Sequence, residues 1–413
     1  MPLIKPFPGL RPPAEYASDV SAPPYDVMNE DEARAMVDGK PWSFLHISRP
    51  EVDLPEGTDP YAPEVYAKAA ENLAKMVDKG ILIQDSDPCY YVYRLTMGGH
   101  VQTGLVAAAS VEAYDRDRIK KHEFTRPKKE DDRVRQIDAL DAQTGPVFLV
   151  YPSHQELDAI LMQATESEAE LDVTAADGVR HQIWLISDDE RTGRISELFE
   201  QMPALYVADG HHRSAAASRV TAQRMAENSS HNGDEPYNYF LTVVFPHNQM
   251  QILPYNRVVR DLNGLDLDTF LARVKIRFAV SPSDQPVMPE ARTEFGMYLA
   301  GQWYKLHTDP ERVPWDDPVS SLDVSILAGE LIEPILGISD PRRDERIDFV
   351  GGIRGLEALE RRVDSGEMAV AFSMYPTSME ALMSVADAGE VMPPKSTWFE
   401  PKLADGLVSH LIK

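Results

Sequence analysis

The densest group of chemically versatile side chains is the run Asp-Gly-His-His-Arg at residues 209–213. Apolar residues 205–207 precede it and predict a strand, and alanine-rich residues 214–218 follow it and predict a helix. Glycine permits a tight turn and lets the backbone approach a ligand closely. The start of a helix exposes unpaired N–H groups and a partial positive charge. The pattern therefore predicts a strand-to-helix turn suited to bind an anion.

The side chains of this turn strengthen the prediction of a phosphate site. Gly210 supplies the turn, and Arg213 can hold a phosphate through two parallel hydrogen bonds. His211, His212 and Ser214 add polar groups at the same helix start. We therefore take these five residues as the candidate contacts to a phosphate group.

Asp209 has three alternative interpretations. It could cap the helix that follows, which is the ordinary role of an aspartate at this position. It could bind Mg²⁺, because a carboxylate beside a phosphate cradle is a usual magnesium ligand. It could also orient a histidine. The residue types alone do not choose among these roles.

A second group of charged side chains lies in residues 120–138. Alternating charge of this kind is typical of a solvated helix and loop. The alternative is a carboxylate base beside cations, because a kinase needs a carboxylate to accept a hydroxyl proton and cations to neutralise the phosphoryl group. Glu123, beside His122, is the candidate base. Lys128 and Arg133 are the candidate phosphate contacts.

Two shorter signals lie near the ends of the chain. Tyr25 and Asp26 follow two prolines, where an aspartate usually stabilises a turn. Asp26 could instead bind the amine of a substrate, with Tyr25 and His122 as further substrate contacts. Lys395 and Lys402 lie on either side of Ser396-Thr397-Trp398-Phe399 and could reach an anionic ligand or belong to a structural clasp.

The composition excludes several classes of protein. The net charge is −26 at pH 7, so DNA is an unlikely partner. A single cysteine, Cys89, excludes an intrachain disulfide and a cysteine-based zinc site. No Gly-x-x-x-x-Gly-Lys-Ser/Thr run occurs, which disfavours a P-loop NTPase. No segment approaches the roughly 18 apolar residues of a membrane span, and the N-terminus lacks an apolar signal region. We therefore expect a cytoplasmic protein without a membrane partner.

The order of the predicted elements indicates a mixed α/β (α+β) fold. We expect three domains: a proline-rich N-terminal and hairpin region at 1–110, a nucleotide-binding core at 111–258 and an α/β domain at 259–413. The first 60 residues should form an irregular wrap over the core, because proline fixes φ and removes a hydrogen-bond donor. The predicted helices are 61–79, 154–166, 189–201, 212–227, 267–274, 322–336, 354–365 and 377–387. The predicted strands are 89–97, 102–111, 147–151, 182–186, 204–208, 347–350 and 368–374, with paired strands over about 296–307 and a hairpin over 239–253 that turns at His247-Asn248.

The chain resembles two groups of proteins. The run 208–213 is similar to the signature of the ParB/sulfiredoxin superfamily, and to its form in the free serine kinases. Over nearly the whole chain, the sequence resembles the domain of unknown function 1015 family. The segments that carry this second resemblance are 22–27, 121–123 with Thr125, Lys128 and Asp132-Arg133, then 144–148, 208–213, 392–397 and 401–402.

The resemblance implies a ParB/sulfiredoxin-like core that binds ATP or ADP with Mg²⁺. It also implies phosphorylation of a small hydroxy-amino acid, with free serine or a related hydroxy acid as the substrate. In the serine kinases a catalytic glutamate lies upstream of the turn, which fits Glu123. Asp209 and His211 would then complete the catalytic group, with Asp209 as the metal ligand.

Two other functions stay open at this stage. One is a nucleotide-binding switch or partner-binding module without turnover, in which nucleotide changes the oligomeric state, for example that of a homodimer. The other is a metal-dependent phosphoester hydrolase with His211 and His212 as ligands.

Overall fold

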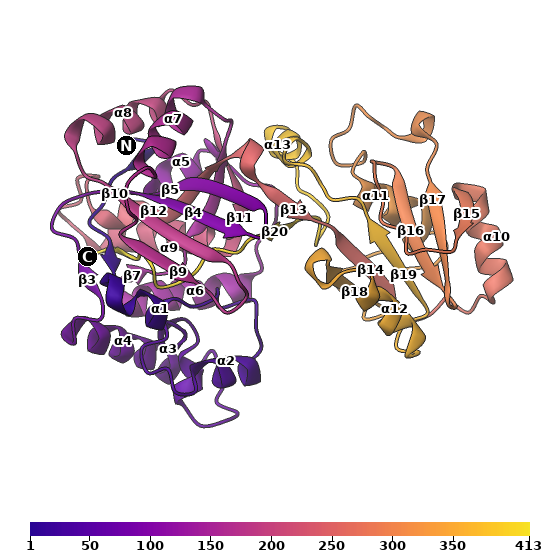
Figure 1. Ribbon diagram of the computed structural model, residues 1–413, viewed down its shortest axis with the longest axis horizontal. Helices are drawn as coiled ribbons and strands as arrows, with labels where there is room; N and C mark the ends of the chain where they lie inside the picture. Colours follow the sequence, from indigo (N-terminus) through magenta and orange to yellow (C-terminus); the bar gives the residue numbers. More distant parts are fainter. The chain divides into compact units, whose positions relative to one another are not determined.

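The computed structural model describes residues 1–413 and divides them into two compact units (Figure 1). The first unit comprises residues 1–250 and 401–413, and the second comprises residues 251–400. No boundary lies near residue 110, because the strand that ends there pairs with strands on both sides of the expected boundary. The second unit starts at residue 251 instead of 259, because residues 251–253 already pair with residues 398–400.

The first unit is built on a nine-stranded mixed sheet. The order of its main path is β6-β11-β8-β12-β5-β4-β10-β9, and β1 also pairs with β5. The unit's strands are β1 (Ile4–Lys5), β2 (Leu10–Arg11), β3 (Ile83–Gln84), β4 (Tyr90–Met97), β5 (His100–Ser110), β6 (Ile119–Lys120), β7 (Ala142–Gln143), β8 (Val147–Tyr151), β9 (Leu171–Thr174), β10 (Arg180–Ile186), β11 (Leu205–Asp209), β12 (Tyr239–Pro246) and β21 (His410–Leu411). Its α-helices are α1 (Ala17–Val20), α2 (Glu30–Val37), α3 (Leu45–Ser48), α4 (Pro63–Asp78), α5 (Val111–Asp115), α6 (Pro127–Leu140), α7 (Gln155–Ala164), α8 (Asp189–Glu200) and α9 (His211–Glu227).

Both faces of this sheet are covered, which explains why its central strands are buried along most of their length. Successive residues of β4 point to opposite faces. The hydroxyl of Tyr90 hydrogen-bonds Ser196 on α8, whereas the hydroxyl of Tyr91 accepts a bond from the N–H of Gly9. Every residue of β12 is buried. The sheet is therefore a rigid platform for the turns at its edges.

Two pairs of strands in this sheet are parallel, namely β6 with β11 and β8 with β12. The predicted hairpin over 239–253 is wrong. β12 pairs with β5 and β8, and the chain then makes a 3-10 turn at His247–Gln249. Residues 251–253 pair with a strand of the second unit.

The proline-rich N-terminal segment contains more helix than the sequence predicts. The helix α2 begins at a capping box in which Asn29 and Glu32 satisfy each other's backbone N–H groups. With α3, α4 and the strand pair β2–β3, this segment encloses its own apolar cluster around Phe44 and Leu73. The predicted helix at 61–79 is confirmed as α4.

The second unit has a six-stranded sheet in the order β15-β17-β16-β19-β14-β18, and all its pairs are antiparallel. Its strands are β13 (Gln251–Leu253), β14 (Tyr255–Val259), β15 (Ala279–Ser283), β16 (Glu294–Leu299), β17 (Gln302–His307), β18 (Ile347–Gly351), β19 (Val370–Met374) and β20 (Trp398–Glu400). Its α-helices are α10 (Leu267–Arg277), α11 (Asp323–Leu327), α12 (Glu357–Asp364) and α13 (Met379–Asp387). The helix predicted over 322–336 is shorter, because α11 passes into a π-helical turn at Ala328–Ile332.

Candidate functional site

The turn between β11 and α9 has the geometry that the sequence predicts, with the helix beginning one residue earlier, at His211. Gly210 occupies the N-cap position with φ of 98°, a left-handed conformation that favours glycine. A Cβ at this position would lie 3.0 Å from Nε of Arg213. The missing side chain therefore allows the turn and leaves room for the arginine.

The parallel pairing of β6 with β11 brings the two predicted groups of functional residues together. Ile119 lies opposite Leu205, and Lys120 lies opposite Tyr206. Both strands then end at the same edge of the sheet, because parallel strands run in one direction. His122 and Glu123 follow the first strand, and the 209–213 turn follows the second.

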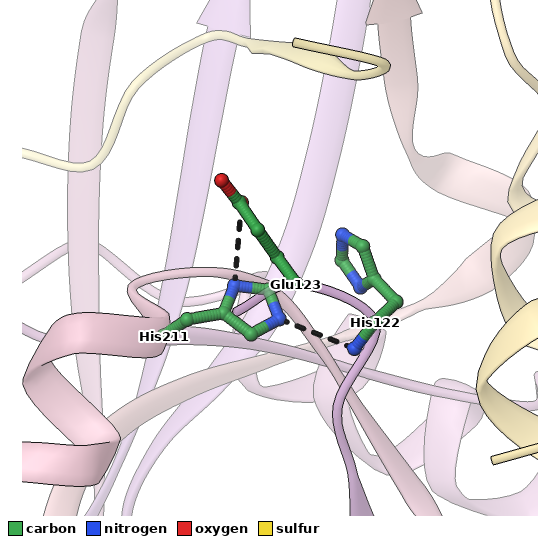
Figure 2. A group of neighbouring side chains, drawn as sticks. All are labelled: His122, Glu123 and His211. Atoms are coloured by element: carbon green, nitrogen blue, oxygen red, sulfur yellow. Dashed lines mark hydrogen bonds and ion pairs between the residues drawn. The ribbon is translucent and has the colours of Figure 1, made fainter. Parts of the chain in front are cut away.

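Figure 2 shows the contact between these two segments. The backbone N–H of His122 donates a 3.4 Å hydrogen bond to Nε2 of His211. Because Nε2 accepts this bond, we assign the ring proton of neutral His211 to Nδ1. That nitrogen faces Oε2 of Glu123 at 3.8 Å. The Glu123 side chain is 50% exposed and that of His211 only 3%, so a buried ring lies beside a solvent-accessible carboxylate.

Both histidines are neutral at pH 7. Burial lowers the pKa of His122 to about 4. Burial, followed by the nearby His122, lowers the pKa of His211 well below its ordinary value. Desolvation disfavours the charged imidazolium, so these rings can donate or accept one hydrogen bond per nitrogen but carry no charge.

Asp209 lies between two cations. Its Oδ2 is 3.5 Å from Nη2 of Arg213 and 3.8 Å from Nζ of Lys402. Burial acts to raise the pKa of Asp209, but the charges of Lys402 and Arg213 outweigh burial and lower it to about 2. The side chain keeps 39% of its exposure. An ionised carboxylate thus reaches solvent at the head of α9, with two cations beside it.

The N-terminal and C-terminal segments meet behind Arg213. Asp405 exchanges backbone hydrogen bonds with Ala22, and its side chain is buried. Burial raises the pKa of Asp405 to about 7, although the charge of Arg213 acts to lower it and the charge of Asp26 adds to the increase. The guanidinium of Arg133 stacks 3.9 Å from the ring of Tyr25. The structure therefore brings Tyr25, Asp26 and Arg133 into the same electrostatic network as Arg213.

The side chains of three predicted contacts have other partners. The hydroxyl of buried Ser214 donates back to the carbonyl of His211 inside the helix. The ammonium of Lys128 lies over the ring of Tyr61 at 4.4 Å. Nε2 of His212 accepts a 2.9 Å bond from the N–H of Arg126, so its ring is directed to a different partner from that of His211.

The residue whose role the sequence left undecided is Lys402. Its partner, Asp209, lies 193 positions earlier in the chain, and no local pattern joins the two. Asp405 was not predicted at all. Its only sequence signal is a single acidic residue in the apolar C-terminal segment 403–408.

A family model described as "Protein of unknown function (DUF1015)" matches residues 4–325. The chain belongs to the DUF1015 family. The matched range of this DUF1015 protein includes both 122–123 and 209–213, whereas Lys402 and Asp405 lie outside it. A search of the curated proteins finds no match.

Several solved structures are similar to this DUF1015 protein. A conserved hypothetical protein from Pyrococcus furiosus is 13% identical, with 74% of this chain and 95% of that chain covered and a TM-score of 0.36. A free serine kinase in complex with AMP is 12% identical, with coverages of 75% and 91% and a TM-score of 0.37. SbnI with a C-terminal truncation, from Staphylococcus aureus, is 12% identical, with coverages of 74% and 87% and a TM-score of 0.37. Separately, none of the helices is both long enough and apolar enough to cross a membrane.

Proposed function

We propose that this DUF1015 protein is a nucleotide-dependent kinase of a small hydroxylated molecule, with free serine or a related hydroxy acid as the candidate substrate. The observation that carries the proposal is the convergence of two segments at one sheet edge. A half-exposed carboxylate, Glu123, lies there beside the head of α9, where Arg213 and Lys402 supply positive charge. The resemblance of the 209–213 motif to that of the free serine kinases supports the same reaction.

The head of α9 is suited to hold the phosphates of the nucleotide. Arg213 and Lys402 bring two positive charges against the single negative charge of Asp209. The N-terminus of α9 adds the partial positive charge of a helix dipole. An anion that enters this site would also replace some of the contacts that the two cations now make with Asp209. ATP and ADP both present such an anion.

Glu123 is the group that would take the proton of the substrate hydroxyl. The hydroxyl oxygen would form a bond to the terminal phosphorus, and the bond from that phosphorus to the rest of the nucleotide would break. The carboxylate receives the hydroxyl proton in the same step. His211 acts as a positioning residue, because its Nδ1 faces the carboxylate while its Nε2 is held by the backbone of His122.

Magnesium, which the family resemblance implies, fits Asp209 only together with phosphate. The carboxylate is ionised and partly exposed, as a Mg²⁺ ligand must be. Two cations within 4 Å of it would nevertheless repel a free divalent ion. Asp209 would therefore hold Mg²⁺ that arrives with the nucleotide, and the ion would neutralise charge on the phosphoryl group.

Asp26 is the candidate contact to the amine of an amino-acid substrate. Its side chain is exposed, and its charge acts on the pKa values of both Arg213 and Asp405. It therefore lies near the head of α9, where an ammonium group could approach it. Tyr25 and His122 are the further substrate contacts that we propose.

The test is ³¹P NMR of the protein incubated with Mg²⁺, with ATP or ADP and with a pool of amino and hydroxy acids. We expect a new phosphomonoester signal that appears with the wild type and with Glu227→Gln, an exposed control on α9. Glu123→Gln should keep nucleotide binding but slow transfer by roughly 10²- to 10⁴-fold. Nucleotide binding without any transfer by the wild type would favour a non-catalytic switch, and no binding at all would refute the proposal.

A further inference from the structure

His122, Glu123 and His211 form a compact group of metal-ligating side chains (Figure 2). One ligand atom from each residue lies within 4.8 Å of those of the other two. The group joins the segment after β6 to the first residue of α9, so the paired strands fix the backbone on both sides. His122 and His211 are buried, whereas Glu123 reaches solvent.

The ring of His122 has an unpaired nitrogen inside this group. Its Nδ1 is buried and has no hydrogen-bond partner. The same ring hydrogen-bonds the backbone of Val207, and this contact acts to raise the pKa of His122. A bond that favours the protonated ring is one in which the ring donates, so its acceptor is the carbonyl oxygen of Val207. Because Nδ1 is the unpaired nitrogen, we assign the proton to Nε2 and a free lone pair to Nδ1. Metal-bound histidines are commonly fixed in this way, with the second ring nitrogen donating to a carbonyl.

We propose that His122, Glu123 and His211 bind a divalent transition-metal ion of the Zn²⁺ type. Two imidazoles and one carboxylate are a ligand set that zinc enzymes use, with the fourth position open to water or substrate. Imidazole favours zinc, cobalt or nickel over magnesium, which prefers oxygen ligands. This site therefore differs in its ligands and in its metal from the magnesium contact proposed for Asp209.

Binding requires a small rearrangement. Two ligand atoms about 2.1 Å from a tetrahedral ion lie roughly 3.4 Å apart, whereas Nδ1 of His211 and Oε2 of Glu123 are 3.8 Å apart. Glu123 can close this distance because its side chain is half-exposed. His211 must also give up the long bond from the N–H of His122. A metal on Nε2 takes the lone pair that accepts this bond, and a proton moved from Nδ1 to Nε2 removes that lone pair while freeing the one on Nδ1. We therefore expect reversible binding that chelators remove without unfolding the protein.

The consequence of metal binding for catalysis rests on the proposed function. A metal bound to the carboxylate of Glu123 prevents that carboxylate from accepting a proton. Zn²⁺ should therefore inhibit phosphotransfer even when Mg²⁺ and nucleotide are saturating, and a chelator selective for Zn²⁺ should restore it.

The primary test needs no nucleotide. Untagged protein, freed of metal, is titrated with Co²⁺ while its visible absorption is recorded, and bound Co²⁺ is then displaced with Zn²⁺. We expect one ion per chain in the wild type. His122→Gln and His211→Asn should weaken binding by more than the roughly 10- to 100-fold that is typical of losing an outer-shell partner. The matched control, His212→Asn, changes the adjacent histidine outside the group and should bind as the wild type does.

A second measurement uses only the wild type, so it tests the ligands even if the variants fail to fold. X-ray absorption spectroscopy of the zinc-loaded wild type should report two imidazoles and oxygen ligands. Absence of a stoichiometric ion in the wild type would overturn the proposal, as would equal loss of binding in His212→Asn, or a spectrum without imidazole. Because these measurements omit nucleotide and substrate, metal binding can be established even if phosphotransfer is not found, and phosphotransfer can be found without it.

Discussion

The sheets of the two units differ in the direction of their strands. The first unit contains the parallel pairs β6–β11 and β8–β12, whereas all the pairs of the six-stranded sheet in the second unit are antiparallel. Parallel neighbours end at the same edge, so the chain segments that follow them meet. Antiparallel neighbours end at opposite edges, and their following segments separate. The candidate site lies where one parallel pair ends.

The two units also differ in the partners of their charged side chains. In the second unit, Arg257 donates to the backbone carbonyls of Tyr255 and Lys395, and Asp323 accepts from the N–H of Thr293. Burial lowers the pKa of Arg257 to about 10 and raises that of Asp323 to about 6. At the candidate site Arg213 also donates to a backbone carbonyl, that of Pro146, but its Nη2 faces the partly exposed carboxylate of Asp209. A charge whose partners are all backbone groups stabilises a fold, whereas a charge that faces another charge beside solvent can exchange partners with a ligand.

The largest effect should come from replacing one arginine in each unit, Arg213 and Arg257, by lysine. Arg213→Lys removes the planar fork that can grip a phosphate and should weaken nucleotide binding on the order of 10- to 100-fold. Arg257→Lys should lower thermal stability and leave nucleotide affinity unchanged. Isothermal titration calorimetry and thermal unfolding of both variants check this. Equal loss of nucleotide affinity in both would contradict the distinction between the units.

Two lysines near the C-terminus offer the next contrast. Lys402 lies beside Asp209, whereas Lys395 of the second unit lies over the ring of Tyr255. Lys402→Met keeps the length of the side chain and removes its charge, so we expect an increase of about 10-fold in KM for the nucleotide. Lys395→Met should have no such effect. Steady-state kinetics at saturating second substrate measure both, and an unchanged KM in Lys402→Met would remove this residue from the proposed site.

The pH dependence of stability separates Asp405 from the buried histidines. Because the pKa of Asp405 is raised to about 7 in the folded state, the folded chain binds more protons than the unfolded chain between about pH 4 and pH 7. Its stabilising contribution is present at low pH and is lost as the pH rises through 7. The pKa values of His122, His181 and His410 are lowered to about 4, so these residues act in the opposite sense between about pH 4 and pH 6.5.

Asp405→Asn isolates the carboxyl contribution. Relative to the wild type, this variant should gain stability by up to a few kcal/mol as the pH rises from 4.5 to about 8. Urea unfolding at several pH values, followed by a probe of the first unit, measures the difference. A difference that stays constant with pH would show that Asp405 is ionised in the folded protein.

The smallest effect should come from the basic run at 342–346 in the second unit. Arg343 is 88% exposed and lies 3.7 Å from Asp340, a weak surface pair. Arg343→Ala should change stability by less than about 0.5 kcal/mol and leave nucleotide binding intact. A clear loss of nucleotide affinity would instead give this unit a direct part in binding.

Elements with a strong local pattern could be predicted from the sequence. The strand, glycine turn and alanine-rich helix around 205–227 were expected and are present, as are α4, α7 and α8. The association of Glu123 with the turn was a hypothesis that the contact with His211 now supports geometrically. Its cause could not be read locally, because β6 has only two residues and its pairing with β11 joins positions 86 apart.

The parts that could not be predicted depend on long-range contacts. Residues 239–253 read as one hairpin because both halves are apolar, but strand partners are chosen by the whole sheet. Lys402 and Asp405 reach the site only because the chain returns to the first unit after residue 400. The sequence around either residue contains no sign of this return.

That return has a consequence for synthesis on the ribosome. Residues 1–250 emerge first, but β7 still lacks its partner β21, and the buried residue Ile412 of the α6–α9 cluster is missing. At roughly 5–20 residues per second, the residues from 251 to 400 take about 8–30 s to be made. During that interval Asp209 has Arg213 but not Lys402. A chain released early would therefore contain the 209–213 motif but lack Lys402 and Asp405.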